Sequence, residues 1–497
     1  MEFTLNSTYL LLLVHSVLAI ISSGHALLYK RDPRSALGWI AVCIAYPIIG
    51  SLLYYIFGIN RVHTRAHLLK GEPHKRLKTG YERSDNLSTD NISPNHQDVY
   101  PSIFIDRPIL AALARSSEAV THRPLVENNT LQAFYEAKNA YSSMLDCIAQ
   151  AQHSVCMTSY IFETNHSGRA FIDALSAAQK RGVDVRVLLD GVGELYSFPQ
   201  AGYLLKKQGV RIARFLPPKF IPPSIHINLR NHRKLLVVDE CIGFTGGMNI
   251  GDRHLHIEGK HHSGISDLHF RLEGPIISQL LAVFNEDWYF VTGDDNQRAD
   301  NALADHHNVD SSEKRNAICR VVTDGPNEDI GKLLMIITGA VSLARQRVLI
   351  MTPYFLPSAT LISALQSAAL RGVEVTIILP ENSNQPLAHW ATRNMLWELL
   401  QFGVHIYYQP PPFAHSKLML IDEDYAHIGS ANLDPRSLRL NFELVVEVFD
   451  QGFILEMAKH FEKIKGVSRE ETLDGVDSRS LLVRIRDAVA WLFSPYL

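Results

Sequence analysis

The stretch "NHRKLLVVDECIGFTGGMN", residues 231–249, has a counterpart in "AHSKLMLIDEDYAHIGSAN", residues 414–432. Both stretches place histidine, lysine, aspartate, glycine and asparagine at the same intervals, H-x-K-x4-D-x6-G-x-x-N. The apolar run after each lysine predicts a buried strand, and side chains two positions apart on an extended chain point to the same face. Each copy therefore predicts a histidine and a lysine presented together, with a buried strand behind them.

The two copies occupy equivalent places in a longer internal repeat. Residues 154–163 and 173–190 predict a strand, a helix, a glycine stop and a second strand, and residues 347–357 and 363–380 repeat this order. Short β-branched runs that alternate with helices are typical of α/β units. We therefore predict an α/β fold in which two homologous domains, each a mixed sheet flanked by helices, are related by a pseudo-twofold axis.

The chain opens with two charge-free apolar stretches, at residues 9–29 and 36–60. About 20 helical residues cross a hydrocarbon layer of ~30 Å, so the pattern predicts a transmembrane helical hairpin within residues 1–70. Two buried helices of a soluble domain are the alternative interpretation. A cluster of lysine and arginine after the second stretch favours a cytoplasmic position for the rest of the chain, whereas the short basic loop at 30–34 argues for the opposite orientation.

Polar segments divide the remaining chain. We predict a linker at 71–117, a first domain at 118–291, a polar linker at 292–317 and a second domain at 318–497. The five cysteines are odd in number and lack CxxC spacing, which favours reduced thiols over a disulfide framework or a zinc site. The net charge of −3 gives no overall basic field, so nucleic acid is not an expected partner.

The repeated residues have the chemistry that phosphoryl transfer requires. A neutral imidazole is a nucleophile at phosphorus, whereas an imidazolium is a proton donor. Two half-sites that meet on a pseudo-twofold axis supply two histidines and two lysines around one anion, and Asn249 and Asn432 can donate amide hydrogens to anionic oxygen. Because the protein supplies the positive charge, we expect neither a metal nor a cofactor.

This pattern resembles the phospholipase D superfamily, in which one chain carries two HKD motifs, and the resemblance spans about Thr130 to Leu497. Further stretches resemble the bacterial membrane-anchored cardiolipin synthases and extend the similarity over nearly the whole chain. They are "RDPRSALGWI" (31–40), "DLHFRLEGP" (267–275), "MTPYFLP" (351–357), "SANLDPRSLRLNFE" (430–443) and "LFSPYL" (492–497).

The resemblance implies roles for the motif residues. One histidine attacks the phosphodiester and forms a phosphohistidine, and the other protonates the leaving alcohol and deprotonates the incoming one. His232 is the expected nucleophile and His415 the expected acid and base, although the spacing itself does not distinguish them. The predicted catalytic motif residues are His232, Lys234, Asp239, His415, Lys417 and Asp422.

Other residues are expected to bind phosphate or to orient the histidines. Lys234, Lys417, Asn249 and Asn432 would bind the phosphoryl oxygens. Glu443 and Asp267 match the acidic residue that follows the motif in relatives and fixes the histidine tautomer. Despite their place in the motif, Asp239 and Asp422 are interpreted as structural residues that bind nearby backbone. Gly247 stands where the second half has Ser430, so one hydrogen bond is expected to be absent there.

The function that the resemblance implies is the joining of two phosphatidylglycerol molecules into cardiolipin with release of glycerol. It also implies a multi-pass protein of the bacterial inner membrane with cytoplasmic catalytic domains. The alternatives are a phospholipase D-type hydrolase, a synthase that uses another phospholipid as phosphatidyl donor, a nucleic-acid phosphodiesterase and a non-catalytic membrane scaffold. The oligomeric state stays open.

Two further patterns have competing interpretations. Five histidines between the motifs lack a metal-binding framework such as HExxH, and we interpret them as loop residues; they are His254, His256, His261, His262 and His269. The C-terminal stretch 480–497 has an apolar stripe with Arg484 and Arg486. This stretch could lie on a bilayer surface, or it could pack on the second domain.

Overall fold

The computed structural model describes residues 2–30, 33–58, 107–220, 223–224, 229–255, 264–294, 316–325 and 331–494. The chain divides into two compact units, Met1–Lys75 and Arg76–Leu497. Most of the two predicted linkers, 71–117 and 292–317, lies outside the described residues, as do His256, His261 and His262. The predicted domain boundaries therefore stay predictions.

The N-terminal unit consists of helices that pack on one another. Its elements are α1 (Glu2–Tyr29), α2 (Pro33–Ala45), α3 (Pro47–Leu53) and the π-helical turn η1 (Tyr54–Gly58). The second predicted span is thus two helices, because Pro47 has no N–H to continue the preceding helix. Tyr54 Oη lies 2.8 Å from His25 Nδ1. Within the described part of the chain no helix combines the length and the apolar character needed to cross a membrane, so the predicted hairpin is not confirmed.

The second unit is built on one sheet of fifteen strands, in the order β19-β14-β13-β12-β16-β17-β18-β11-β1-β10-β8-β7-β2-β3-β4. The first half of the chain contributes β1 (Val126–Phe134), β2 (Ser154–Ser159), β3 (Asp184–Asp190), β4 (Arg211–Phe215), β7 (Leu235–Val238), β8 (Ile242–Gly246) and β10 (His269–Glu273). The second half contributes β11 (Ala317–Asp324), β12 (Arg347–Met351), β13 (Glu374–Pro380), β14 (His405–Gln409), β16 (Leu418–Ile421), β17 (Tyr425–Gly429), β18 (Glu443–Phe449) and β19 (Arg469–Glu471).

The strand order confirms the internal repeat. From the central antiparallel pair of β1 and β11, it reads β1-β10-β8-β7-β2-β3-β4 in one direction and β11-β18-β17-β16-β12-β13-β14 in the other. Strands β2, β3 and β4 are parallel to one another, as are their equivalents β12, β13 and β14. The inner strands are antiparallel, and the second half adds the edge strand β19, which is antiparallel to β14. The predicted mixed α/β fold with two homologous halves is therefore correct, and the two halves share a single sheet.

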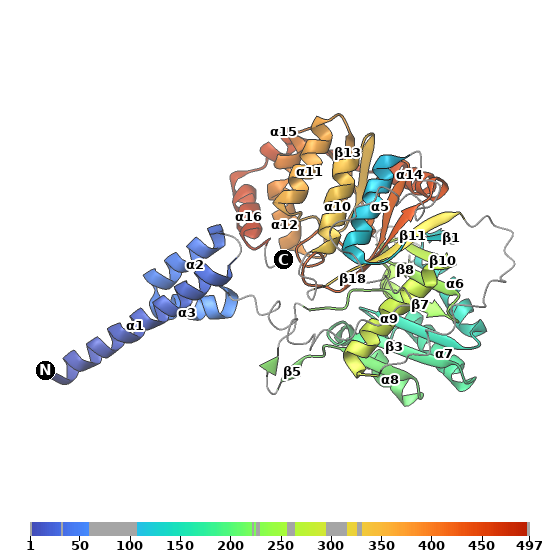
Figure 1. The fold of residues 1–497 in the computed structure, drawn as a ribbon, viewed down its shortest axis with the longest axis horizontal. Coiled ribbons are helices and arrows are strands. Elements are labelled where there is room, and N and C mark those ends of the chain that lie inside the picture. The colour runs from blue at the N-terminus through green and yellow to red at the C-terminus, as the bar shows by residue number, and fades with distance from the viewer. Residues whose placement is uncertain are drawn as a thin grey trace, which may run out of the picture. The chain divides into compact units, whose positions relative to one another are not determined.

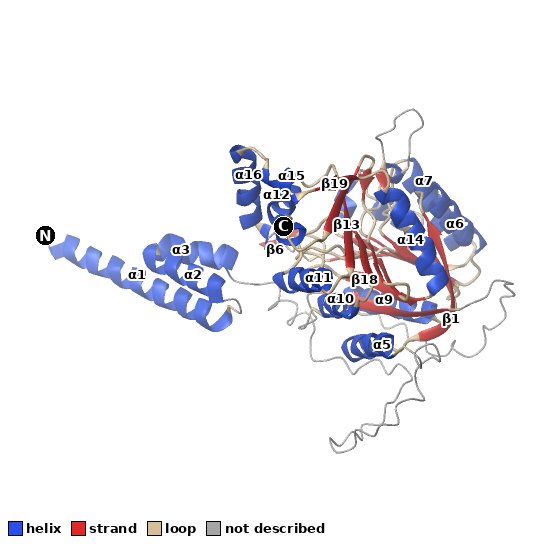
Figure 2. Ribbon diagram, turned by 90° about the horizontal axis from the view of Figure 1, so that it is seen from above, coloured by secondary structure: helices blue, strands red, loops and turns tan. Residues whose placement is uncertain are grey.

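Helices lie on both faces of this sheet (Figures 1 and 2). The first half contains α6 (Ala137–Gln150), α7 (His166–Lys180), η4 (Gly193–Tyr196), α8 (Ala201–Lys207), η5 (Asp252–His254) and α9 (Ile276–Thr292). The second half is covered by α5 (Pro108–Thr121), α10 (Lys332–Leu343), α11 (Ala359–Leu370), α12 (Pro386–Met395), α13 (Trp397–Leu400), α14 (Gln451–Lys465), α15 (Leu473–Asp477) and α16 (Leu481–Leu492). Short strands β5 (Lys219–Phe220), β6 (Pro223–Ser224), β9 (Ile265–Ser266) and β15 (Phe413–Ala414) complete the elements.

One hydrophobic core spans both halves and joins them. It contains the buried side of α9 from the first half and of α14 from the second, with the sheet residues that they cover. Phe270 on β10 packs edge-on against Phe453 on α14, with ring centroids 5.9 Å apart. Separate cores lie under α6 and α7 in the first half, and under α10 and α11 in the second. Because both halves bury apolar side chains in this core, the core fixes their relative position.

A buried ion pair fixes α5 to the central strands. The Arg320 side chain on β11 is fully buried, and its Nε lies 2.8 Å from Glu447 Oε2 on β18. The same guanidinium donates to the Ala114 carbonyl at 3.0 Å, and Glu447 accepts hydrogen bonds from the hydroxyls of Ser117 and Tyr425. Burial alone would raise the pKa of Glu447, but the charge of Arg320 holds it below the ordinary value. Every charge in this network is therefore compensated.

Replacing Arg320 by methionine should strongly destabilise the protein. Glu447 would keep its buried charge without a counterion, and breaking one side of a buried pair costs about 3–5 kcal/mol. The free energy of unfolding can be measured by denaturant titration of the purified protein. The exposed Arg115 on α5 provides the matched control, because Arg115→Met should change stability by less than about 0.5 kcal/mol. Equal small effects of the two substitutions would contradict this account.

Candidate active site

The two motifs meet in one pocket between the halves. A cavity of about 150 Å³ is lined by His232 and Asn249 from the first motif and by His415 and Asn432 from the second. Both histidines are more than nine-tenths buried. The structure thus brings together the predicted imidazoles, which lie 183 residues apart in the sequence.

Each histidine is held by the opposite half of the chain. His232 Nδ1 lies 3.0 and 3.1 Å from the two carboxylate oxygens of Glu443, and the His232 backbone N–H donates to the Phe442 carbonyl at 3.0 Å. His415 Nδ1 lies 2.7 Å from Asp267 Oδ2, and its backbone N–H donates to the Ser266 carbonyl at 2.7 Å. The sequence match places each acid after the motif of its own half. The structure exchanges them, so that each acid orients the other half's histidine.

Glu443 is surrounded by hydrogen-bond donors, of which the sequence analysis missed Ser437 and Asn441. Ser430 donates to its carboxylate, as do Ser437 Oγ at 2.9 Å and Asn441 Nδ2 at 3.3 Å. Burial opposes the charge of Glu443, but His232 and Lys234 hold its pKa below the ordinary value. The signal in the sequence was the row of polar residues between the second motif and Glu443, within "NLDPRSLRLNFE".

The carboxylate of Asp267 has fewer partners. It accepts the Leu268 N–H at 2.8 Å besides its contact with His415, and burial raises its pKa, opposed by Lys417. A Cβ atom at Gly247 would lie 2.2 Å from Asp267 Oδ1. The serine found in the second half therefore does not fit here unless Asp267 moves, which gives the physical reason for the expected loss of one hydrogen bond.

The two motif lysines are buried beside the histidines. Lys234 Nζ donates to the His232 carbonyl at 2.6 Å, and Lys417 Nζ donates to the His415 carbonyl at 2.5 Å. Burial lowers the pKa of Lys234 to about 7 and that of Lys417 to about 8. It also lowers the pKa of His232, and burial together with Lys417 lowers the pKa of His415 well below its ordinary value. The pocket therefore favours neutral imidazoles.

The asparagines and glycines of the motifs have different surroundings. Asn249 Oδ1 accepts the Ile161 N–H at 3.2 Å, and Asn432 Nδ2 donates to Ser437 Oγ at 3.2 Å. Gly246 and Gly429 have φ values of 152° and 153°, and an added Cβ would lie within 2.6 Å of a carbonyl oxygen on the neighbouring strand. Glycine is required at both positions because the backbone of an adjacent segment approaches so closely.

Asp239 and Asp422 lie away from the pocket, although the motif groups them with the catalytic residues. Asp239 accepts hydrogen bonds from three successive backbone N–H groups, those of Gln152, His153 and Ser154. Asp422 does the same at residues 345–347. Each aspartate follows its histidine by seven positions of largely extended chain, a path on the order of 20 Å. These contacts agree with the interpretation of both aspartates as structural residues, and they disagree with the grouping of the two among the catalytic residues.

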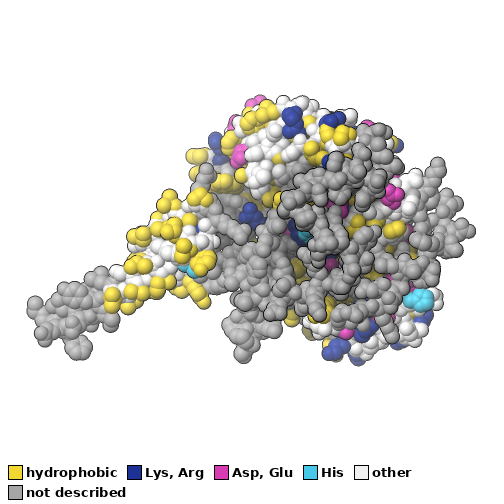
Figure 3. Space-filling view, viewed as in Figure 1, with side chains coloured by type: hydrophobic (Ala, Val, Ile, Leu, Met, Phe, Trp, Pro, Cys, Tyr) yellow, Lys and Arg dark blue, Asp and Glu magenta, His cyan; other side chains and the backbone are white. Residues whose placement is uncertain are grey.

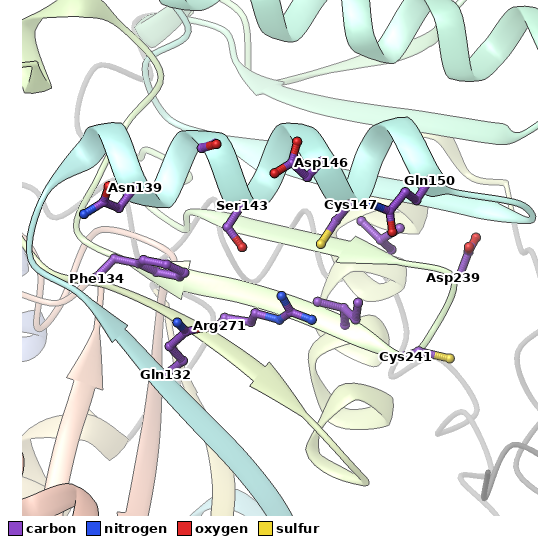
Figure 4. Close-up of a pocket in the computed structure, with 13 residues that line it drawn as sticks. Gln132, Phe134, Asn139, Ser143, Asp146, Cys147, Gln150, Asp239, Cys241 and Arg271 are labelled. Atoms are coloured by element: carbon purple, nitrogen blue, oxygen red, sulfur yellow. The ribbon is translucent and has the colours of Figure 1, made fainter. Parts of the chain in front are cut away.

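A larger cavity, of about 710 Å³, lies beside Asp239 between α6 and the sheet (Figure 4). Asn139 and Ser143 on α6 face the strands that carry Gln132 and Arg271 (Figure 4). The lining residues that the structure describes include no histidine and no lysine. This cavity is therefore separate from the pocket that holds the histidines of the two motifs.

Two of the five histidines interpreted as loop residues are buried elements of the fold. His254 ends η5, and its Nε2 accepts the Asn249 N–H at 3.2 Å. His269 begins β10 and is 2% exposed. Burial lowers the pKa of His254 to about 3 and that of His269 to about 4. The loop interpretation was wrong for both, because a neutral imidazole can be buried where a charged one cannot.

The fold and the paired histidines define a phospholipase D-like protein with two half-sites. A solved structure, phosphatidylserine synthase from Haemophilus influenzae Rd KW20, has the same fold with a TM-score of 0.59 and 15% identity, covering 78% of this chain and all of that one. The family model described as "Cardiolipin synthase, PLD-like domain" matches residues 144–288 and 337–465, and a "Phospholipase D-nuclease N-terminal" model matches residues 17–58. The chain belongs to the bacterial cardiolipin synthase family of the phospholipase D superfamily.

Curated relatives align along nearly the whole chain. The major cardiolipin synthase ClsA of Bacillus subtilis (strain 168) is 30% identical over 94% of this chain and 95% of its own length. Cardiolipin synthase 1 of Bacillus anthracis is 28% identical over 100% of this chain and 96% of its own length. The similarity therefore includes both halves and the N-terminal unit.

Affinity of the pocket for a small anion should fall as pH rises. The protonated lysines attract an anion, and with pKa values of about 7 for Lys234 and about 8 for Lys417 they lose their charge through that window. Sulfate is a suitable probe because its own charge does not change there. We expect its affinity, measured by titration calorimetry, to drop by about tenfold or more across the window. The Lys234→Met, Lys417→Met double variant should bind weakly at every pH, and a wild-type affinity independent of pH would contradict the assignment.

Proposed function

We propose that the protein transfers a phosphatidyl group from one phosphatidylglycerol molecule to another, giving cardiolipin and glycerol. The observation that carries this proposal is the pair of buried imidazoles in one small pocket, each bonded through Nδ1 to a carboxylate of the other half. The names of the relatives along the full length of the chain support the same reaction. No nucleotide is required, since one phosphodiester is exchanged for another.

The first step forms a covalent intermediate on the proposed nucleophile His232. With Nδ1 facing Glu443, the Nε2 lone pair attacks phosphorus, the bond from phosphorus to the glycerol oxygen breaks, and His415 donates a proton to that oxygen. In the second step His415 takes the proton of the incoming hydroxyl, whose oxygen displaces His232 from phosphorus. Two in-line displacements predict ping-pong kinetics and retained configuration at phosphorus.

The remaining motif residues stabilise charge on the phosphoryl group. Lys234 and Lys417 place positive charge beside the two histidines, and Asn249 and Asn432 line the same pocket. Fixed cations and amides in a water-poor site stabilise a phosphoryl transition state without reorganisation. The burial of both histidines supports transfer to a lipid hydroxyl in preference to hydrolysis, because water has little access to the intermediate.

Substitution of either histidine by alanine should abolish cardiolipin formation. Loss of the nucleophile or of the proton donor is expected to lower turnover by at least about a thousandfold. Mass spectrometry of products formed in phosphatidylglycerol vesicles gives the measurement, and circular dichroism checks folding. The exposed His153 supplies the control, since His153→Ala should retain activity. Near-normal turnover by His232→Ala or His415→Ala would refute the assignment, and phosphatidic acid without cardiolipin from the wild type would indicate a hydrolase.

We further propose that the N-terminal unit anchors the protein in the bacterial inner membrane as a multi-pass segment, with the catalytic halves in the cytoplasm. The charge-free stretches at 9–29 and 36–60 support an anchor, and the match of residues 17–58 to an N-terminal family model agrees with it. All five cysteines are free thiols, which supports a reducing compartment for the halves.

Exposed apolar side chains near the pocket support contact with lipid. Tyr196 lines the pocket and is 57% exposed, and the nearby Phe198 is 96% exposed. Helix α16 packs on α12, where Arg486 lies 4.5 Å over the ring of Trp390. On the face opposite its buried residues Asp487 and Ala490, Leu481 and Ile485 are 70% and 51% exposed. Hydrophobic side chains are visible over α16 in Figure 3. Both interpretations of the C-terminal stretch thus have support, packing on one face and lipid contact on the other.

A tryptophan at position 198 should report contact with the acyl chains. In proteoliposomes that contain brominated phosphatidylglycerol, Phe198→Trp should add strongly quenched fluorescence to the signal of the parent protein. Leu370→Trp is the matched control. Leu370 is 69% exposed at the C-terminal end of α11, whereas the pocket residues Tyr354 and Leu356 precede the N-terminal end of this helix. Equal quenching of the two added tryptophans, or none at position 198, would contradict lipid contact at the pocket.

A further inference from the structure

Three arginines line the pocket beside the catalytic residues, and they differ in their counterions. Arg230 forms a buried ion pair with Asp190 at 3.1 Å. Arg253 is paired with Glu163. Among the residues that the structure describes, no carboxylate lies within ion-pair distance of Arg436, and its buried Nε has no hydrogen-bond partner. The pocket therefore holds one guanidinium whose charge is not neutralised by an ion pair within the described fold.

The internal repeat explains how this arginine came to be unpaired. Arg253 follows Asn249 by four residues, as Arg436 follows Asn432. Glu163, the counterion in the first half, donates its backbone N–H to the Ile250 carbonyl at 2.9 Å. The residue in the same register of the second half is Leu356, whose N–H donates to the Leu433 carbonyl at 2.8 Å. The second half thus keeps the arginine but has a leucine in place of its acid.

Asp434, two residues before Arg436, does not form the missing ion pair. Asp434 lines the pocket and accepts the Ser437 N–H at 2.7 Å. Burial raises the pKa of Asp434 to about 6, so a part of this group is protonated near neutral pH. A guanidinium that is partly desolvated without a counterion is costly to the free protein, and it is suited to binding an anionic ligand.

We propose that Arg436 binds the phosphate of the acceptor lipid, the second phosphatidylglycerol. This inference rests on the proposed function. The histidines, lysines and asparagines of the motifs bind the phosphoryl group that is transferred. The acceptor lipid brings a second phosphodiester, which is one glycerol unit away from its attacking hydroxyl. Two anions in one pocket need separate cations, and the planar fork of arginine suits a phosphodiester. Asn384 and Gln385 on the same pocket provide polar groups for the glycerol hydroxyls.

In this step Arg436 binds and orients but exchanges no proton. The terminal oxygen of the acceptor forms the new bond to phosphorus, and the bond from phosphorus to His232 breaks with its electron pair returning to Nε2. The proton of the acceptor hydroxyl passes to His415. Because a small neutral alcohol can accept the phosphatidyl group without a second phosphate, Arg436 should matter for lipid acceptors alone.

The test compares two acceptors in the same vesicles. The full-length protein is assayed in phosphatidylglycerol vesicles with added ethanol, and cardiolipin and phosphatidylethanol are quantified together by mass spectrometry. Arg436→Gln should lower cardiolipin formation by about tenfold to a hundredfold, the effect of one charge-assisted hydrogen bond, while phosphatidylethanol changes by less than about threefold. Arg436→Lys should restore part of the cardiolipin. The exposed Arg439 in the same segment is the control, because Arg439→Gln should leave both products unchanged.

Each outcome decides between specific alternatives. If both products fall together in Arg436→Gln, the arginine acts on the donor phosphate or on folding, and the inference is overturned. If cardiolipin is unaffected, the acceptor phosphate binds elsewhere, and the inference is again overturned. If the wild type forms phosphatidylethanol but no cardiolipin, the proposed synthase function itself fails and the inference falls with it.

Discussion

The exchange of carboxylates between the halves is the constraint on which the rest of the structure depends. His232 needs Glu443 and His415 needs Asp267, and each contact is reinforced by a backbone hydrogen bond to the residue just before the acid. A half of this chain standing alone would present a histidine without the group that fixes its tautomer. The antiparallel pairing of β1 with β11 and the core shared by α9 and α14 hold the halves at the spacing that these contacts require. The sheet is therefore continuous for a chemical reason as well as for burial of apolar surface.

The two halves keep the same strand order but have diverged around the pocket. Ser430 supports Glu443, whereas Gly247 leaves no room for such a group beside Asp267. A similar difference is found at the central strands. Glu447 on β18 pairs across the sheet with Arg320 under α5, while Arg271, at the same register of β10, pairs with Gln132 and faces the cavity of Figure 4. Divergence is expected because the two steps of the reaction handle different alcohols, free glycerol in one and a lipid hydroxyl in the other.

Much of this architecture could be predicted from the spacing of the repeated residues. The H-x-K pattern followed by four apolar residues correctly predicted β7 and β16, and the repeat of helices and strands correctly predicted two related α/β halves. The exchange of Glu443 and Asp267 could not be predicted from this spacing, because an alignment of the two halves assigns each acid to the motif of its own half. The packing of one half against the other decides which histidine each acid contacts. The burial of His254 and His269 was hidden for a related reason, since a neutral histidine in a core has no distinctive pattern. Ser437 and Asn441 were missed because polar residues near a motif are common in loops.

Electrostatics links the buried pocket to its ligand. Burial favours neutral forms of His232 and His415 and lowers the pKa values of both lysines, while Glu443 keeps its charge. An entering phosphodiester adds negative charge and favours the protonated lysines, which in turn disfavour protonation of the imidazole that must attack. The other imidazole can then gain its proton only as charge develops on the leaving oxygen. The position of the substrate in the pocket thus decides which histidine attacks and which one donates a proton. For that reason two nearly equivalent half-sites can catalyse an asymmetric step.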